Sequence, residues 1–305
     1  MTHSHRPLGA RNSKLEATLP IVDGYFNSFD GTKIYYCIEG EGKPLVFCYG
    51  LVCSSLHWAY QINYFSKKYK TIWLDYRGHQ KSEMPDDLNK ISLDALSKDV
   101  AELFKVLDIK NAPIMGHSMG VNVVLELYRH SPELVHSMIL TSGTPTRPLE
   151  TLLLSNTLEP AFQLLEVLSK YFPKILNKIW RLQKNNPIVH KAVGMLGFNI
   201  KHAHMDDIAL YVDQIADLDP NLFLKLIRDY DQYEGTSWLH LINKPTLVIA
   251  GEKDLVVPLK RQELLHQLIP LSTIELIKDG SHCPQMDFPD DINSKIDSFL
   301  KKINY

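Results

Sequence analysis

The sequence predicts an α/β protein, with a mostly parallel sheet flanked by helices and an all-helical cap inserted between two strands. Short apolar runs bounded by Gly, Pro and Asp alternate with longer helical patterns along most of the chain. The alternation stops between residues 147 and 241, where Leu-rich helical patterns take over and no convincing strand is found. With 305 residues, 45% of them hydrophobic, the chain can bury a sizeable core in one large domain or two.

The individual elements follow from these runs. Eight strands are expected over residues 21–28, 33–38, 44–49, 71–75, 113–115, 135–141, 246–250 and 273–277. Asp30-Gly31 joins the first two as a hairpin turn. Helices are expected over residues 56–68, 93–107, 119–130 and 290–302. The chain is thus predicted to divide into an N-terminal extension (1–20), a core (21–146 and 242–305) and a helical cap (147–241).

Composition excludes several classes of protein. Lys+Arg 33 against Asp+Glu 35, with no long run of one sign, argues against an electrostatic nucleic-acid binder. No apolar run approaches the roughly 18 residues that a membrane span needs. The first 20 residues are polar and lack the apolar segment of a signal peptide, so we expect a cytoplasmic protein. The four cysteines form no CxxC pair and are expected to be free thiols.

A nucleophile motif lies between a predicted strand and a predicted helix. Gly116-His117-Ser118-Met119-Gly120 matches G-x-S-x-G, for which chance predicts roughly 0.05 matches in this chain. A sharp strand-to-helix turn would lift the Ser118 hydroxyl into the open, and glycines at both ends would leave space for the turn. The alternative is a glycine-rich turn with an idle serine.

A serine nucleophile needs a base, and the base needs an orienting acid. Asp254 follows the strand at 246–250, and His282 follows the strand at 273–277. Taken singly, Asp254 could cap a turn and His282 could be a solvated loop residue. Glu252 is the weaker candidate acid, and Asp279 lies too near His282 in sequence to face its ring easily.

These residues resemble the α/β-hydrolase-fold superfamily, in its capped serine esterase and lipase type. The resemblance covers about residue 21 to the C-terminus and rests on Gly116–Gly120, Gly251–Asp254, Gly280–His282 and Asp75–Gly78. It implies the chain order serine, acid, histidine, with Ser118 as nucleophile, His282 as base and Asp254 as its orienter. It also implies an oxyanion hole formed by the backbone N–H groups of Leu51 and Met119.

The chain departs from this family at one loop. Tyr49-Gly50 stands where the family usually has His-Gly. Activity should survive, because the oxyanion donor is a backbone N–H, but the departure bears on the loop path and on Leu51. The serine also separates this chain from epoxide hydrolases and haloalkane dehalogenases, which place Asp where Ser118 stands.

Further residues are candidates for binding roles. We expect Tyr49, His57 and Trp58 to contribute to the substrate pocket, the alternative for the last two being a partly buried helix face. His202 and His204, near Asp206 and Asp207, could suggest a metal, but no third ligand motif supports one. We therefore expect no metal and no cofactor.

The cap carries an uneven distribution of charge. Residues 147–201 include eight basic and three acidic side chains, whereas residues 203–236 include two basic and eight acidic ones. Two cap layers could attract one another, or a basic face could contact an anionic surface, giving peripheral membrane contact. The favoured interpretation is a cap helix packed on the core with a solvated basic side.

The function predicted from the sequence is a serine hydrolase that cleaves carboxylic esters through an acyl-enzyme, with a small-molecule ester as its partner. The Leu-rich cap favours apolar acyl groups, and the absence of bulky aromatics just after Gly50 favours medium length. The alternatives are a carbon–carbon bond hydrolase, a lactonase or a cofactor-free perhydrolase using the same residues, and a non-catalytic small-molecule receptor.

Overall fold

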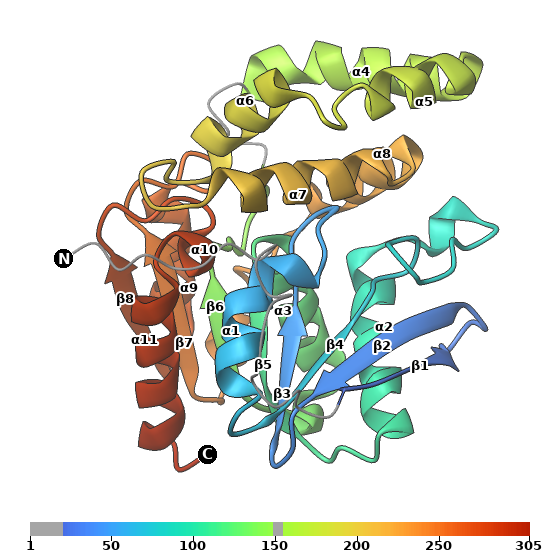
Figure 1. Cartoon of the computed structure of the whole chain (residues 1–305). Helices are drawn as coiled ribbons and strands as arrows, with labels where there is room; N and C mark the ends of the chain where they lie inside the picture. Colours follow the sequence, from blue (N-terminus) through green and yellow to red (C-terminus); the bar gives the residue numbers. More distant parts are fainter. Residues whose placement is uncertain (1–20, 149–154) are drawn as a thin grey trace.

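One eight-stranded sheet organises the protein (Figure 1). The computed structural model describes residues 21–148 and 155–305, so the N-terminal extension lies outside the described residues. The strand order is β1-β2-β4-β3-β5-β6-β7-β8. The bounds are β1 Ile21–Asn27, β2 Lys33–Glu39, β3 Pro44–Cys48, β4 Lys70–Leu74, β5 Ala112–His117, β6 Val135–Thr141, β7 Thr246–Gly251 and β8 Ser272–Ile277.

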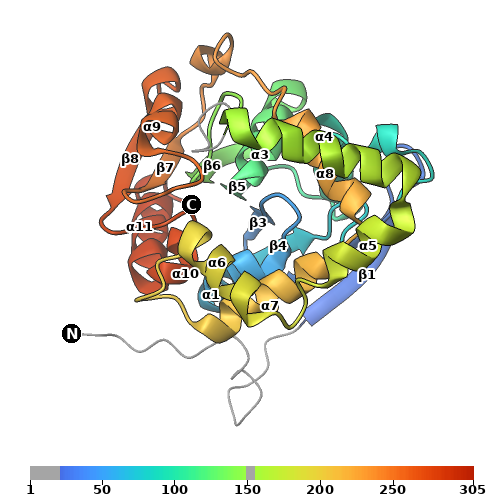
Figure 2. The same cartoon turned by 90° about the horizontal axis from the view of Figure 1, so that it is seen from above.

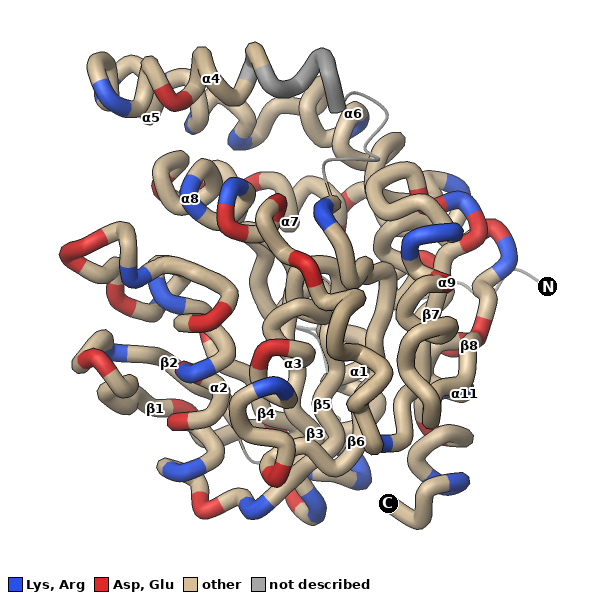
Figure 3. Tube along the Cα trace, turned by 180° about the vertical axis from the view of Figure 1, so that it is seen from behind, with Lys and Arg blue, Asp and Glu red and all other residues tan. Residues whose placement is uncertain are grey.

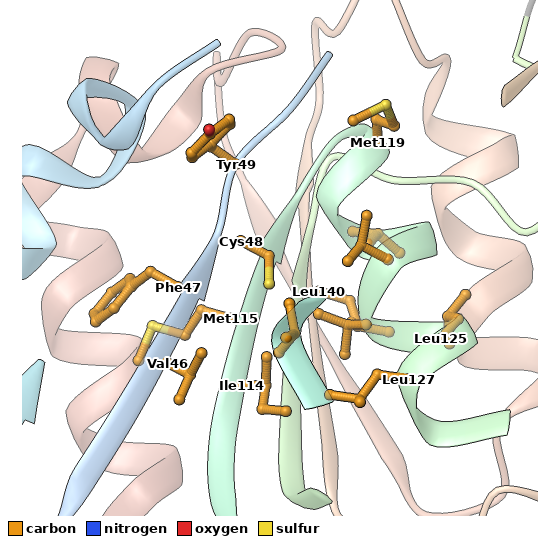
Figure 4. Packing of buried hydrophobic residues seen from close by; sticks show 14 of the residues in the cluster. Val46, Phe47, Cys48, Tyr49, Ile114, Met115, Met119, Leu125, Leu127 and Leu140 are labelled. Atoms are coloured by element: carbon orange, nitrogen blue, oxygen red, sulfur yellow. The ribbon is translucent and has the colours of Figure 1, made fainter. Parts of the chain in front are cut away.

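Strand β2 pairs antiparallel with both β1 and β4, and the other neighbouring strands pair in parallel. The central strands β3, β5 and β6 are buried along nearly their whole length because helices cover both of their faces. In Figure 4, Ile114 and Leu140 lie on the side of the sheet where Leu127 packs, whereas Phe47 and Met115 lie on the other side. The mostly parallel α/β fold is therefore confirmed.

Helices cover both faces of this sheet (Figures 1 and 2). Helices α1 and α11 lie on one face, and α2, α3 and α9 lie on the other. The predicted helix at 56–68 is a short 3-10 turn followed by α1, and α9 was not predicted. The bounds are α1 Ala59–Phe65, α2 Leu93–Val106, α3 Met119–His130, α9 Leu259–Leu268, α10 Pro284–Asp287 and α11 Pro289–Lys302.

Between β6 and β7 the chain forms a helical insertion, as the sequence predicts. Figure 1 shows α7 and α8 next to the carboxyl ends of the strands, with α4, α5 and α6 farther from the sheet. We call α7 and α8 the inner layer and α4, α5 and α6 the outer layer. Their bounds are α4 Ser155–Tyr171, α5 Pro173–Arg181, α6 Pro187–Gly197, α7 Met205–Ala216 and α8 Pro220–Tyr230. Whether the insertion is a separate cap domain stays a prediction.

The inner layer is attached to the core through both apolar and polar contacts. Ile208 of α7 and Leu222 of α8 are fully buried. Hydrogen bonds connect this layer to the core, among them those from Tyr60 Oη to Asp207 at 2.6 Å, from Ser54 Oγ to Gln214 Oε1 at 2.6 Å and from the Leu93 N–H to Asp229 at 2.7 Å. Within the described ranges, no helix combines the length and the apolarity that crossing a bilayer requires.

Candidate active site

Ser118 occupies a strained turn between β5 and α3. Its φ of 55° and ψ of −124° lie in a region that L-residues rarely adopt. A Cβ on Gly116 would lie 2.6 Å from the Gly120 carbonyl oxygen, and a Cβ on Gly120 would lie 2.6 Å from the Cys48 carbonyl oxygen. Both contacts are with backbone, which cannot rotate away. The motif therefore has glycine at these positions because the turn packs against β3 and against itself.

The structure brings together the three residues predicted to form the reactive group. His282 Nε2 lies 3.0 Å from Ser118 Oγ, and His282 Nδ1 lies 2.9 Å from Asp254 Oδ2. A carboxylate only accepts hydrogen bonds, so in the neutral imidazole Nδ1–H donates to Asp254. Nε2 is then left as an acceptor for the serine hydroxyl.

The carboxylate of Asp254 is held by three further donors. Its Oδ1 accepts the N–H groups of Val256 and Val257, both at 2.8 Å, and its Oδ2 accepts Gln262 Nε2 at 3.0 Å. Gln262 is fully buried on α9. Sequence reasoning missed this residue, because a buried glutamine on a helix of weak apolar periodicity resembles a surface position. These three donors hold the Asp254 carboxylate in the orientation in which Oδ2 contacts His282 Nδ1.

The competing acids lie elsewhere. The exposed Glu252 accepts a hydrogen bond from the Asp279 N–H at 3.1 Å, and the Asp279 carboxylate pairs with Lys253. These contacts connect the loops after β7 and β8 at the surface. Asp254 is thus the acid that contacts His282 in this structure.

A pair of histidines, His57 and His117, lies behind His282. His117 Nε2 lies 2.8 Å from the His282 carbonyl oxygen, so Nε2–H donates to that carbonyl. His57 Nδ1 lies 3.1 Å from His117 Nδ1, which must accept if His117 is neutral. Burial lowers the pKa of His57 to about 3 and holds the pKa of His117 well below its usual range. Two neutral histidines therefore anchor the backbone of His282.

The predicted pocket residues are buried. Tyr49 Oη accepts the Tyr76 N–H at 2.6 Å, and Trp58 Nε1 donates to the Cys48 carbonyl at 2.9 Å. Tyr49, Trp58 and His57 are each 2% exposed or less. The structure thus gives these side chains packing and hydrogen-bonding roles within the fold. Their contribution to a substrate pocket stays a prediction.

The candidate oxyanion donors lie beside the serine. Met119 is the first residue of α3, and the first N–H groups of a helix have no acceptor within it and carry partial positive charge. A Cβ on Gly50 would lie 3.2 Å from Ser118 Cβ, so the backbone leading into Leu51 passes directly by the nucleophile. The role of the two N–H groups as an oxyanion hole stays a prediction.

Tyr230, at the C-terminal end of α8, is a residue that the sequence analysis did not single out. Its side chain is buried, and its hydroxyl oxygen has no hydrogen-bond partner within the described part of the chain. Burial raises the pKa of Tyr230 and the charge of Asp254 raises it further, whereas Ser118 lowers it. The hydroxyl thus stays protonated at neutral pH and can donate a hydrogen bond beside the nucleophile.

The region around His202 and Asp207, considered above as a possible metal site, makes other contacts. The His202 ring packs against the Phe288 ring in a tilted arrangement at a centroid distance of 4.6 Å, and Asp207 accepts a hydrogen bond from Tyr60. Among the residues that the structure describes, no group of three or more His, Cys, Asp or Glu side chains is placed to hold a metal ion.

A surface cleft of about 480 Å³ lies away from the serine, between α2, α3 and the segment after α8. Asp94, Glu126, Arg129 and Asp229 are among its lining residues. None of Ser118, His282 and Asp254 lines it. We therefore place the candidate chemistry at the turn between β5 and α3 that carries Ser118, which we call the elbow, and not in this cleft.

The sheet, its strand order and the serine at a strand–turn–helix elbow define the class as an α/β hydrolase fold. Residues 43–289 match the alpha/beta hydrolase fold family, and the chain belongs to that family. The chain is 23% identical over 283 residues to "Epoxide hydrolase 4" of Mus musculus, covering 89% of this chain and 77% of that protein. It is 26% identical over 278 residues to "Putative carbamate hydrolase RutD" of Pseudomonas syringae, covering 88% and 97%.

Among solved structures, an esterase from Exiguobacterium antarcticum superposes with a TM-score of 0.75 at 22% identity, covering 91% of this chain and 98% of that chain. Other similar structures include an enol-lactonase, a bromoperoxidase and an epoxide hydrolase. At this identity the likeness establishes the fold, which hosts several hydrolytic and related chemistries.

Proposed function

We propose that this protein is a serine hydrolase that cleaves carboxylic esters with apolar, medium-length acyl groups through an acyl-enzyme. The observation that carries the proposal is the hydrogen-bonded series from Asp254 through His282 to Ser118 at the elbow. A nucleophile, a base within hydrogen-bond reach and a third group that orients the base together favour nucleophilic catalysis.

The proposed mechanism uses groups already in contact. Ser118 Oγ attacks the ester carbonyl carbon while His282 Nε2 takes the hydroxyl proton, and Asp254 stabilises the resulting imidazolium. The backbone N–H groups of Leu51 and Met119 would hold the oxyanion. Collapse of the tetrahedral intermediate transfers the proton from His282 to the leaving alcohol. Water then attacks the acyl-enzyme by the same route and releases the acid and free Ser118.

The chemistry of the elbow separates this proposal from epoxide hydrolysis. One relative is named an epoxide hydrolase, but Ser118 provides a hydroxyl at the position where that chemistry would use a carboxylate. A lactone is a cyclic ester, and the same three residues could open one. The similar structures of an enol-lactonase and of an enzyme that degrades N-acyl homoserine lactones favour testing lactones as the second substrate class.

The test is a series of p-nitrophenyl esters from acetate to dodecanoate, run beside a lactone panel with the wild type and Ser118→Ala. We expect a burst of p-nitrophenol equal to the enzyme concentration, and a kcat/KM that rises from acetyl to medium chains. Each additional buried methylene contributes up to about 0.8 kcal/mol, or roughly fourfold. Ester turnover unchanged in Ser118→Ala would overturn the proposal. Covalent labelling of Ser118 without turnover of any ester or lactone would indicate the receptor alternative.

A further inference from the structure

Large apolar side chains are exposed along α4 of the outer layer. Leu164, Val167 and Tyr171 are 59%, 48% and 62% exposed. The opposite side of the same helix faces α8, where the Phe162 ring packs on Phe223. A helix spacing of three to four residues places the exposed trio on one face, away from α8. This face has no partner within the described chain.

Helix α5 repeats the arrangement. Leu176 is buried, and Trp180 Nε1 donates to the Ile215 carbonyl at the end of α7, so these two residues mark the inner side. Ile175 and Ile179 are each about half exposed. The exposed apolar residues continue at the ends of the helix with Phe172 and Leu182, and then with Ile188 at the start of α6, which is 79% exposed.

The same surface is strongly basic. Residues 160–201 hold one carboxylate, Glu166, against seven basic side chains, Lys170, Lys174, Lys178, Arg181, Lys184, Lys191 and Lys201. Glu166 accepts a hydrogen bond from Arg228 of α8, and Lys184 forms an ion pair with Asp217 at the end of α7. Within the described ranges, Lys174, Lys178 and Arg181 are exposed and have no ion-pair partner. Figure 3 shows basic positions along α5.

Single exposed apolar residues are ordinary, but a contiguous set on neighbouring helices marks a docking surface. A second copy of this chain is a poor occupant, because a two-fold contact would place one basic stripe against another. Apolar side chains flanked by Lys and Arg match the boundary of an anionic bilayer, where the apolar groups enter the acyl region and the cations reach the headgroup phosphates.

We propose that the outer layer docks onto a membrane surface rich in anionic phospholipid. The docking face comprises the exposed apolar residues of α4 and α5 together with Lys174, Lys178 and Arg181. This proposal does not rest on ester hydrolysis, because the face lies on the side of the insertion away from the inner layer and contains none of the candidate catalytic residues.

The test is cosedimentation of the full chain with vesicles of phosphatidylcholine alone or mixed with phosphatidylglycerol. We expect binding to the mixed vesicles, little binding to phosphatidylcholine alone, and weakening as salt is added. Neutralising Lys174, Lys178 and Arg181 to Gln should reduce partitioning roughly fivefold per cation. The double variant Ile175→Ser, Ile179→Ser should reduce it about tenfold or more, because two apolar anchors are lost.

Matched controls separate docking from general stickiness. Leu271 and Leu276, which are 56% and 49% exposed on the core, serve as the apolar control when both are changed to Ser. Lys67, Lys278 and Lys302 are exposed core lysines and serve as the charge control when changed to Gln. Both control variants should bind mixed vesicles as the wild type does. Thermal unfolding of every variant checks that the fold is retained.

Three results would overturn the proposal. The first is absence of binding to mixed vesicles. The second is equal binding to both vesicle types with no effect of the lysine and arginine changes. The third is a concentration-dependent dimer that the Ile175→Ser, Ile179→Ser variant dissociates, which would assign the face to a second copy of the chain. All three measurements are made without substrate, so they stay separate from failure of the proposed esterase function.

Discussion

The elbow around Ser118 and the outer layer of the insertion are opposite extremes of this molecule. At the elbow, His282 and Asp254 are buried and hydrogen-bonded, and the backbone at Ser118 adopts a strained turn between β5 and α3. In the outer layer, Leu164, Tyr171 and many other apolar side chains contact solvent. The contrast teaches that packing within this chain accounts for the elbow and does not account for the apolar composition of the outer layer.

The largest expected effect is loss of the base. In His282→Ala, Ser118 loses its proton acceptor, so kcat/KM for p-nitrophenyl butyrate should fall about a thousandfold or more. Asp254→Asn should have a somewhat smaller effect, because the imidazole keeps a partner but loses the orienting charge. Stopped or continuous p-nitrophenol release measures both. A loss below tenfold in His282→Ala would show that the histidine is not the base.

Stability should separate the inner layer from the outer layer. Leu222 of α8 is fully buried, so Leu222→Ala should lower the free energy of unfolding by about 2 to 5 kcal/mol. Ile188 of α6 is 79% exposed, so Ile188→Ala should change it by less than about 0.5 kcal/mol. Urea unfolding of the two variants tests this, and equal losses would mean that the outer layer also packs against the fold.

Buried titratable groups should make the protein less stable in mild acid. Burial lowers the pKa of His57 to about 3 and the pKa of His79 to about 4. It also holds the pKa of His117 well below the usual value of 6.5. The free energy of unfolding is unaffected by these histidines above about pH 6.5 and falls below that pH. The reason is that the histidine rings bind protons in the unfolded chain but stay neutral in the folded protein. Burial raises the pKa of Asp75 and Asp287 to about 6, which partly offsets the loss.

We therefore expect a net loss of stability as pH falls from about 7.5 to 5.5, because three buried histidines oppose folding there and two carboxyl groups offset only part of this. Urea midpoints across that range measure it. His79→Gln lies outside the candidate site and removes one of the three histidines, so this variant should lose about 1 kcal/mol less stability than the wild type over the same range. An identical pH slope in wild type and His79→Gln would contradict the role of buried neutral histidine.

The smallest effect is expected from the hydroxyl beside the nucleophile. Tyr230→Phe removes a neutral hydrogen-bond donor and leaves the ring in place, so kcat/KM should fall about tenfold. The Tyr233→Phe variant, a neighbouring buried tyrosine, is the matched control and should fall by less. Equal losses in the two variants would indicate a packing effect and not a contact with substrate.

The sequence predicted the sheet well because its central strands are apolar runs bounded by Gly, Pro and Asp. It missed α9, whose buried side includes Gln262, and it could not place His117, which lies inside the nucleophile motif but contacts the His282 backbone. Buried polar residues of this kind resemble surface residues in a sequence, and only the fold reveals their partners.

In the helical insertion, the sequence could not show which apolar side chains are buried and which are exposed. Its helices were predicted, but helical periodicity cannot tell whether an apolar face meets the core or solvent. Leu176 and Ile175 are neighbours in sequence, yet the first is buried and the second is about half exposed. Tyr49, His57 and Trp58 were predicted to contact substrate, and the structure gives each of them hydrogen bonds within the core.

The central claim is that Ser118 is the nucleophile, and covalent labelling tests it most directly. A fluorophosphonate reacts with a serine that a neighbouring base activates. Intact mass followed by peptide mapping should find one adduct per chain, on Ser118, with labelling absent in Ser118→Ala and strongly slowed in His282→Ala. Stoichiometric labelling of another residue, or full ester turnover by Ser118→Ala, would contradict the account.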